Sequence, residues 1–528
     1  MLGGLFKTAL QLQQVKVRDR VRKEKKQAFL LYKTAQIRDK SLRRYAENAI
    51  LLSDEGEHPP LFCILCRQDG GYGMNEMALT EGKVKTTLLR FTLPFLAATL
   101  LQFLYGAADL IIVGQFANAA GVSAVSTGSQ IMQMFTGLAM GLASGGTVIV
   151  GQYWGARRRE DVQETIGTMF CFFTLFALAM TAFILLFVDP IIAVMNVPEE
   201  AKVPAWDYIF ICGCGTIFIT GYNMVSGILR GMGDSKRPMY FVMVACVVNV
   251  VGDLILVGGF GMGAAGAAIA TVASQALSLL LSVLVLRRKD FPFDFKRASF
   301  RIHRDKLISL VKLGTPVAIQ NILVSLSFLI ITAIVNNIGL VESAAVGTAG
   351  RIGDFGLLGP IAFLSAISAM VAQNIGAGRE DRAKATLKYG ILFSLVFGVV
   401  MFVLLQLFPQ GAMSIFNNDQ RVIEAGALYL RSFCFDSLLT CFVFSLNGFF
   451  GGCGRTGFAL ANSVLATFLV RVPVVLIVSL IPDTTIFHIG MATPLASAFQ
   501  VVVQLIYYRL GRWKGAVLVQ EGAPADES

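Results

Sequence analysis

Long apolar runs separated by short polar segments occupy the chain from Leu88 onward. The runs are about twenty residues long or longer, which is the length that an α-helix needs to cross a bilayer. A membrane-spanning barrel would show short strands of alternating character instead. The pattern therefore predicts an all-α polytopic membrane protein with twelve transmembrane helices. The predicted spans are residues 88–114, 120–144, 162–187, 205–230, 238–258, 264–286, 307–337, 344–372, 384–408, 422–452, 456–481 and 487–509.

Basic residues divide the loops between these spans into two classes. Alternate loops are rich in lysine and arginine, as at residues 157–159, 287–312 and 379–388, whereas the intervening loops hold only Lys202 and Arg421. Cytoplasmic loops of membrane proteins carry the excess of lysine and arginine. The charge pattern thus predicts a multi-pass protein of the cytoplasmic (inner) cell membrane with both termini in the cytoplasm.

An internal repeat relates the two halves of the chain in a constant register. The segment GVSAVSTGSQI at Gly121 resembles ESAAVGTAGRI at Glu342, and GQYWGARRRED at Gly151 resembles AQNIGAGREDR at Ala372. Each half holds six spans, so both halves enter the membrane from the same side. We therefore expect two six-helix lobes related by a pseudo-two-fold axis along the membrane normal, with a central cavity suited to transport.

Domain boundaries follow from the repeat and from composition. We expect an N-lobe at residues 78–286, a basic cytoplasmic linker at 287–312, a C-lobe at 313–514 and a C-terminal tail at 515–528. Residues 1–77 form a polar, basic leader that we expect to be disordered. We also expect natural translation to begin at Met74 or Met77, so the leader is excluded from reasoning about the fold.

Two carboxylates lie inside the apolar spans of the first half. Asp109 lies fifteen residues after Pro94, and Asp253 lies fifteen residues after Pro238. At about 1.5 Å per residue, both carboxylates reach a depth of roughly 22 Å from the predicted cytoplasmic side. An ionisable residue at this depth is costly and therefore indicates a functional site. Pro94 is a candidate hinge, although proline is also ordinary in a first helical turn.

Neutral polar residues complete a candidate cation site around these carboxylates. The first half has no lysine or arginine in the predicted membrane interior, so a mobile cation, H+ or Na+, would have to neutralise Asp109 and Asp253. Asn249 lies one helical turn before Asp253, and Thr271 reaches a similar depth in the next span. Carboxylate, amide and hydroxyl oxygens suit a hard cation. Alternatively, Asn249 and Thr271 form interhelical hydrogen bonds and Asp109 lies at a hydrated helix end.

The acids of the second half have basic residues within reach. Asp354 follows Arg351 by one helical turn, and Asp436 has Arg431 and Arg471 as potential partners. We therefore interpret both acids as members of structural ion pairs. They remain the alternative positions for a cation site.

Composition and missing motifs exclude other classes of function. The 528 residues are 55% hydrophobic and only 15% charged, with a mean hydropathy of +0.66, which excludes an ordinary soluble domain. The sequence contains no GxxxxGK[ST] motif for ATP and no HExxH or nucleophile elbow. We therefore expect no enzymatic activity, no cofactor and no nucleic-acid partner. The expected partners are a small organic molecule and the lipid bilayer, and the expected state is a monomer.

Four motifs give the chain a family resemblance. They are ILRGMGDSKRPM, VAQNIGAGREDRAKA, VGQYWGARRRED and ADLIIVGQ, and they resemble the multidrug and toxic compound extrusion (MATE) family. The resemblance extends from Leu79 to about Lys514. It implies an antiporter in which entry of H+ or Na+ drives the export of an amphipathic, usually cationic, organic compound by alternating access.

The resemblance also assigns roles to individual residues. The set Asp109, Asn249, Asp253 and Thr271 resembles the cation site in the first lobe of the DinF-like branch, and Pro94 matches a first-helix proline whose bending accompanies protonation. Three further residues are implied as polar groups near the site or the cavity, and the third departs from the family pattern, which has asparagine there: Tyr208, Asn223 and Ser226.

Two alternative functions remain open from the sequence. One is a flippase for a lipid-linked sugar precursor, a rival within the same superfamily. Such proteins usually have additional spans or a basic central cavity, and the interior of the first lobe lacks basic residues. The other is a membrane sensor or scaffold that transports nothing.

Overall fold

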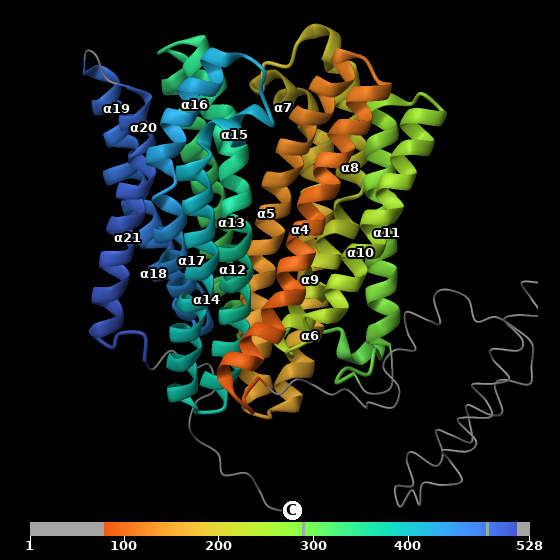
Figure 1. Ribbon diagram of the computed structural model, residues 1–528. Helices are drawn as coiled ribbons and strands as arrows, with labels where there is room; N and C mark the ends of the chain where they lie inside the picture. The colour runs from red at the N-terminus through yellow and green to blue at the C-terminus, as the bar shows by residue number, and fades with distance from the viewer. Residues whose placement is uncertain (1–78, 288–290, 482–484, 515–528) are drawn as a thin grey trace, which may run out of the picture. The chain divides into compact units, whose positions relative to one another are not determined.

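The computed structural model describes residues 79–287, 291–481 and 485–514, and the predicted leader and tail lie outside these ranges. Within them, ten helices are long and apolar enough to cross a membrane, or up to twelve if each of two bent helix pairs is one span. This number agrees with the twelve predicted spans. The helices run up and down through one bundle (Figure 1).

The spans fall into two groups of six, which we call the N-lobe and the C-lobe. The N-lobe consists of α4 (Val84–Phe116), α5 (Ala119–Gly155), α6 (Arg159–Leu186), the short α7 (Val188–Val194), α8 (Glu199–Cys214), α9 (Thr216–Gly231), α10 (Lys236–Asp253), the π-helical turn η1 (Leu254–Gly259) and α11 (Gly263–Leu286). The linker contains the 3-10 turn η2 (Arg297–Ser299). The C-lobe consists of α12 (Arg304–Asn336), α13 (Leu340–Gly376), α14 (Glu380–Leu407), the short α15 (Pro409–Ser414), α16 (Gln420–Phe433), α17 (Asp436–Gly452), α18 (Thr456–Leu465), the π-helical turn η3 (Ala466–Arg471), α19 (Val472–Leu480), α20 (Ile486–Gly490) and α21 (Ala492–Arg509).

The fourth span of each lobe is broken, which the sequence did not predict. Helices α8 and α9 meet at 47°, and α16 and α17 meet at 46°. Gly215 lies at the first break, where an added Cβ would come within 2.4 Å of the Val272 side chain on α11. The bend is thus accompanied by a close contact with a neighbouring helix, which hydropathy cannot reveal.

The first half of α12 packs against the N-lobe although α12 belongs to the C-lobe. A Cβ at Gly141 would lie 2.4 Å from the backbone of Ala318, and a Cβ at Gly145 would lie 2.6 Å from the backbone of Gly314. Small residues of this kind let two helix backbones approach closely in a membrane. The second half of α12 returns to the core of its own lobe, where Val335 is fully buried.

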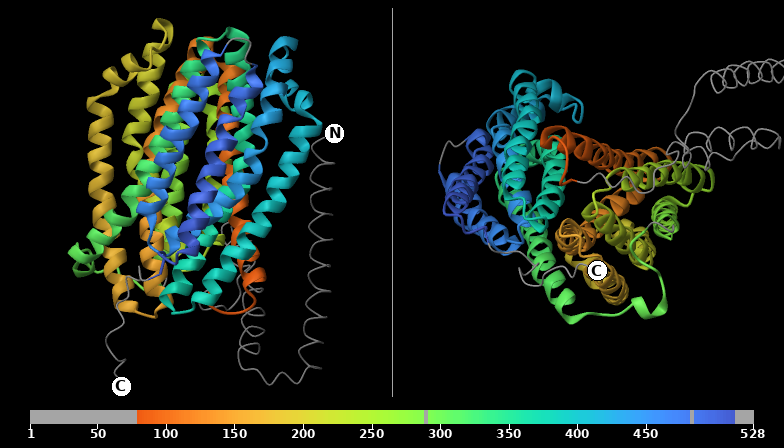
Figure 2. Two further views of the ribbon diagram at one scale, coloured as in Figure 1. Left: turned by 90° about the vertical axis from the view of Figure 1, so that its left-hand side faces the viewer. Right: turned by 90° about the horizontal axis from the view of Figure 1, so that it is seen from below.

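Helix α4 makes the reciprocal crossing. Leu88 and Phe91, in its first half, are fully buried in a core cluster formed mainly by C-lobe residues, whereas Val113 is buried in an N-lobe cluster. Pro94 lies inside α4 and Pro316 inside α12, each close to the point where the helix passes between lobes. The two lobes therefore exchange the first halves of their first helices. Seen from below, the blue and cyan helices of the C-lobe form one group and the orange to yellow-green helices of the N-lobe form the other (Figure 2).

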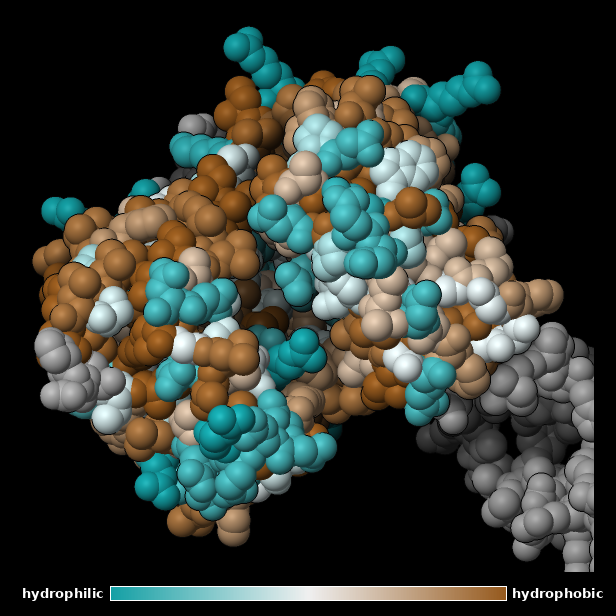
Figure 3. All heavy atoms as spheres, turned by 90° about the horizontal axis from the view of Figure 1, so that it is seen from above, coloured by the Kyte–Doolittle hydropathy of each residue, from teal (hydrophilic) through white to brown (hydrophobic). Residues whose placement is uncertain are grey.

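Lysine and arginine mark one end of the bundle. The loops and helix ends near Arg157, Arg237, Arg301, Arg379 and Arg455 all lie at the end where α4 begins, which is at the bottom of Figure 1. We call this the basic end. Seen from above, the opposite end is hollowed between the two lobes, and hydrophilic residues lie around the hollow (Figure 3).

Helix α12 begins at Arg304, inside the segment that the sequence predicted to be a linker. Its first turn is held by Lys306, whose side chain is buried and forms ion pairs with Asp161 of the N-lobe and with Asp305. The Nζ atom also donates to Tyr153 Oη at 3.1 Å. A lysine whose charge is balanced by carboxylates can be buried in a packed helix. The charged residues before residue 313 were predicted from their charge to belong to the linker, whereas the helix already begins at Arg304.

We predict that Lys306→Met destabilises the protein, because it removes the buried partner of Asp161 and leaves that partly buried carboxylate with only the more exposed Arg158. The expected loss is about 2 kcal/mol, between the values for exposed and fully buried pairs. Thermal unfolding in detergent measures it as a lower Tm. Lys312→Met, an exposed lysine on the same helix, is the control. Equal Tm values for both variants would contradict the prediction.

Candidate functional site

The predicted site residues of the first lobe meet inside the N-lobe. Asp109 comes from α4, Asn249 and Asp253 from α10, and Thr271 from α11. The Asp109 side chain interacts with the side chains of all three other residues. The structure thus brings together residues from the first, fifth and sixth spans, which lie far apart in the sequence.

Small residues allow α10 and α11 to bring their polar groups together. A Cβ at Gly252 would lie 3.0 Å from the Cβ of Ala270, so the two helices approach closely at this level. One turn away, Asn249 Nδ2 donates to Thr271 Oγ1 at 3.4 Å. Because the amide nitrogen of Asn249 binds Thr271, the amide oxygen does not bind this threonine.

Buried oxygens dominate the cluster. Asn249 and Asp253 are fully buried and Asp109 is 7% exposed. One oxygen of Asp109, both oxygens of Asp253 and the amide oxygen of Asn249 accept no hydrogen bond. A buried acceptor without a donor is costly, so this arrangement favours a bound proton or a metal cation.

The charge of this cluster is not balanced by a fixed basic group. In the described part of the chain, no lysine, arginine or histidine nitrogen forms an ion pair with Asp109 or Asp253 within 4.0 Å. The turn η1 begins directly after Asp253, and such π-helical turns inside α-helices often accompany functional sites. Carboxylate, amide and hydroxyl oxygens in one buried place form a donor set that fits H+ or Na+.

Tyr105 and Gln275 also belong to this neighbourhood, and sequence reasoning missed both. Tyr105 interacts electrostatically with Asp109, and the Gln275 side chain lies near its hydroxyl group. The signal was present, because Tyr105 precedes Asp109 by one helical turn. Tyr208 interacts electrostatically with Asp109, and Gly128 on α5 makes room for its ring, since a Cβ there would lie 2.4 Å from the tyrosine. The predicted role of Tyr208 near the site stays a prediction.

Asn223 and Ser226 contact other groups. Asn223 Nδ2 donates to the Ile219 carbonyl of its own helix at 2.9 Å, and the Ser226 side chain interacts with Tyr222. Both residues are buried in α9, but these contacts include none of the four residues of the carboxylate cluster. Their predicted roles near the cavity stay predictions.

The C-lobe contains a second buried polar group with a different charge balance. Asp436 and Arg471 are each 6% exposed and interact electrostatically, although these two described residues form no ion pair within 4.0 Å. Arg471 Nη1 donates to Ser327 Oγ at 3.2 Å, and its guanidinium lies over the Phe328 ring. Asp436 therefore has a fixed cation nearby, which Asp253 lacks.

The remaining alternative acid, Asp354, is exposed on α13 and has only an electrostatic interaction with Arg351, one turn earlier. Its side chain is not enclosed by the protein, in contrast to the buried carboxylates of Asp109 and Asp253. Of the acids predicted as candidates, those of the N-lobe combine burial with a missing fixed counter-charge.

Comparison with known proteins gives relatives along most of the chain. The chain is 27% identical over 450 residues to the probable multidrug resistance protein YoeA of Bacillus subtilis, covering 83% of this chain and 97% of that protein. It is 24% identical over 456 residues to the probable multidrug resistance protein NorM of Thermotoga maritima, covering 83% and 95%. It is 25% identical over 360 residues to the FAD transporter of Shewanella oneidensis, covering 67% and 78%.

Solved structures share the fold. A MOP-superfamily transporter from Pyrococcus furiosus matches with a TM-score of 0.79 at 21% identity, covering 84% of this chain and 98% of that chain. A multidrug resistance MATE transporter in an outward-facing conformation matches with the same TM-score and identity, covering 84% and 99%. Both likenesses confirm the predicted arrangement of transmembrane helices in two lobes.

The MatE family model matches residues 94–255 and 316–477, once in each lobe. The two matches together span more than half of the 528 residues. The chain therefore belongs to the multidrug and toxic compound extrusion (MATE) family, whose members are membrane transporters and not enzymes.

Proposed function

We propose that this transporter is a cation-coupled antiporter in which H+ or Na+ binds between Asp109 and Asp253 and drives export of an organic compound by alternating access. The observation that carries the proposal is the pair of buried carboxylates whose oxygens accept no hydrogen bond. A mobile cation neutralises them when it binds and leaves them charged when it departs. A site of this kind can couple an ion gradient to a conformational change.

The two lobes differ in a way that supports coupling through the N-lobe. Asp436 of the C-lobe interacts electrostatically with the buried guanidinium of Arg471. Among the described residues, no basic side chain forms an ion pair with Asp109 or Asp253 of the N-lobe. The N-lobe carboxylates therefore depend on an ion from solution, whereas Asp436 has a tethered cation nearby.

The orientation and the cargo are part of the same proposal. The basic end faces the cytoplasm by the positive-inside rule, which puts the hollowed end outside and both termini inside. Several relatives are named as probable multidrug resistance proteins, which supports an organic, drug-like cargo. The family resemblance implies that this cargo is amphipathic and cationic. One relative is named as a FAD transporter, so an organic anion is the second cargo class to examine. The proposed transporter acts as a monomer.

The first test is gradient-driven transport in everted membrane vesicles. Ethidium should accumulate in the lumen when the lumen is made acidic or is loaded with Na+, and only one of the two gradients should be effective. The reason is that a site for one coupling ion responds to the gradient of that ion alone. Ethidium fluorescence records the rate.

Vesicles without the transporter and vesicles treated with an ionophore are the controls, and FAD is assayed in parallel. If neither gradient moves either compound, the antiport proposal fails. If FAD moves and ethidium does not, the coupling stands and the cationic cargo class is wrong.

A further inference from the structure

Two glutamines at the basic end are related by the internal repeat and have no role in the cation site. Gln152 lies in the last turns of α5 and Gln373 in the last turns of α13. The register that pairs Gly151 with Ala372 also pairs these two glutamines. Gln152 is fully buried and Gln373 is 1% exposed. The hydrogen-bond partners of the two buried amides indicate what these side chains do.

Both glutamines donate hydrogen bonds to the opposite lobe. Gln152 Nε2 in the N-lobe donates to the Gly452 carbonyl at the end of α17, at 3.0 Å. Gln373 Nε2 in the C-lobe donates to the Gly231 carbonyl at the end of α9, at 2.7 Å. The same repeat register pairs the two acceptor glycines with each other. The two bonds therefore form a pseudo-symmetric pair that crosses the boundary between the lobes in both directions.

Backbones of the two lobes touch beside these bonds. A Cβ at Gly155 would lie 2.0 Å from the Gln373 carbonyl oxygen, and a Cβ at Gly376 would lie 1.9 Å from the Gln152 carbonyl oxygen. Only glycine fits such an approach. Gly151 faces the Ala372 side chain, since a Cβ added at Gly151 would lie 3.0 Å from the Ala372 Cβ.

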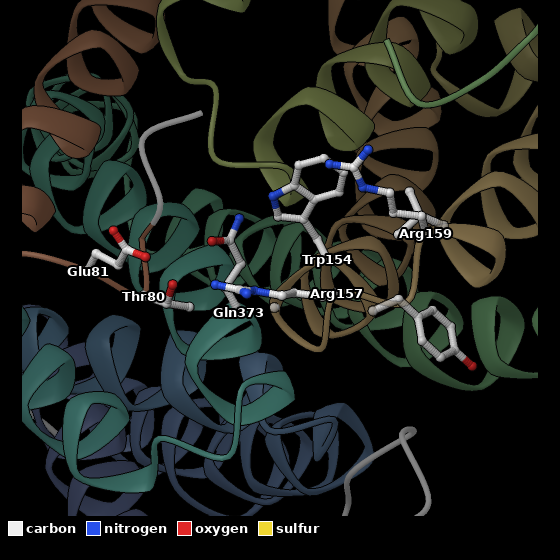
Figure 4. A pocket seen from close by; sticks show the side chains of 9 residues that line it. Thr80, Glu81, Trp154, Arg157, Arg159 and Gln373 are labelled. Atoms are coloured by element: carbon white, nitrogen blue, oxygen red, sulfur yellow. The ribbon is translucent and has the colours of Figure 1, made fainter. Parts of the chain in front are cut away.

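The segment before α4 adds a second connection at the same end. Arg382 of the C-lobe donates to the carbonyls of Gly82 and Glu81, at 2.7 and 2.8 Å, and Asn374 Nδ2 donates to the Leu79 carbonyl at 3.2 Å. A pocket of about 290 Å³ lies between this segment and the ends of α5 and α13. Figure 4 shows Thr80 and Glu81 on one side of the pocket, Arg159 on the other, and Gln373 with Arg157 between them.

We infer that Gln152 and Gln373 are paired latches that hold the lobes together at the basic end and set how often that end opens. The inference rests on the alternating access proposed above, because the basic end must open once per cycle. We call the contact between residues 151–155 of the N-lobe and 372–376 of the C-lobe the seam. Each hydrogen bond there contributes only a small net free energy to the closed state, since water replaces it when the seam opens. Two such bonds stabilise the closed state without making it permanent.

A cysteine at the seam can report the opening. Ala372 is fully buried and faces Gly151 of the other lobe, so we place Ala372→Cys in a chain whose nine native cysteines are replaced by serine or alanine. The full chain is reconstituted in lipid vesicles and labelled with a maleimide. Gln152→Ala or Gln373→Ala should raise the labelling rate roughly three- to tenfold, and the double variant by more than about tenfold.

The matched control is Gln504→Ala. Gln504 is also fully buried, and its Nε2 donates to Asn447 Oδ1 at 2.8 Å, within the C-lobe alone. This variant loses a buried amide bond without affecting the seam, so its labelling rate should stay at the parent value. Equal acceleration in Gln504→Ala and in the latch variants would overturn the inference, because it would indicate general loosening. Unchanged labelling in the double variant would also overturn it.

The readout is independent of cargo and coupling ion. Acceleration in the latch variants supports the latches even if ethidium transport follows neither gradient. The latch inference alone fails if gradient-driven transport is normal and labelling does not respond. A membrane-impermeant maleimide, applied to vesicles of known orientation, separately tests whether the basic end faces the cytoplasm.

Discussion

Asp253→Asn is expected to slow gradient-driven efflux strongly while leaving the protein folded. Asparagine keeps the size of the side chain and removes its charge, so the site can no longer release and take up a cation. Coupling between two ligands in a protein is typically about 1–3 kcal/mol, and its loss should lower the gradient-driven rate roughly 5- to 150-fold. The initial rate of ethidium accumulation under the effective gradient measures this loss.

The control for this variant is Asp354→Asn, which changes an exposed carboxylate of the C-lobe. It should transport at nearly the parent rate, and the Tm values of both variants should stay close to the parent value. Normal gradient-driven transport by Asp253→Asn would show that coupling does not depend on the N-lobe cluster. Asp436 would then be examined, together with Arg471→Met so that no buried charge is left alone.

The sequence was sufficient to predict the twelve spans, the repeat and the orientation hypothesis. The spans follow from long apolar runs, the repeat from similar segments in the two halves, and the orientation from basic residues in alternate loops. The sequence could not predict the breaks between α8 and α9 or between α16 and α17. The break at Gly215 lies within an apolar run and is accompanied by packing against Val272. The packing of the first halves of α4 and α12 against the opposite lobe could not be predicted either, because hydropathy does not show which lobe a helix face contacts.

The candidate site was predictable where depth in the membrane could be counted. Asp109, Asn249, Asp253 and Thr271 lie at matching depths, and the structure brings them together. Tyr105 was missed although its helical spacing from Asp109 was available.

Interactions that depend on side-chain direction could not be predicted. Arg471 points to Ser327 and Phe328, so its relation to Asp436 is a neighbouring charge and not a direct ion pair. Spacing along the chain gives which residues can meet, but packing decides which contacts form.

Gly376→Ala should produce the other large effect, by preventing closure of the basic end. The added Cβ would lie 1.9 Å from a backbone oxygen of the other lobe, and no side-chain rotation can relieve a contact with the backbone. Overpacking of this kind costs about 1–3 kcal/mol. Because the clash lies between the lobes, the molecule can avoid it by separating them, so we expect a shift toward the state open at the basic end.

The shift should lower the efflux rate roughly 5- to 150-fold, in proportion to the lost population of the closed state. Gly350→Ala is the matched control, since it lies on the same helix and a Cβ there would meet nothing within 4 Å. Ethidium transport, Tm and maleimide labelling at Ala372→Cys are measured on both variants. Faster labelling with an unchanged Tm would attribute the lost transport to the conformational equilibrium, because a folding defect would lower the Tm as well. Parent-like transport and labelling in Gly376→Ala would instead mean that the seam does not close through this contact during the cycle.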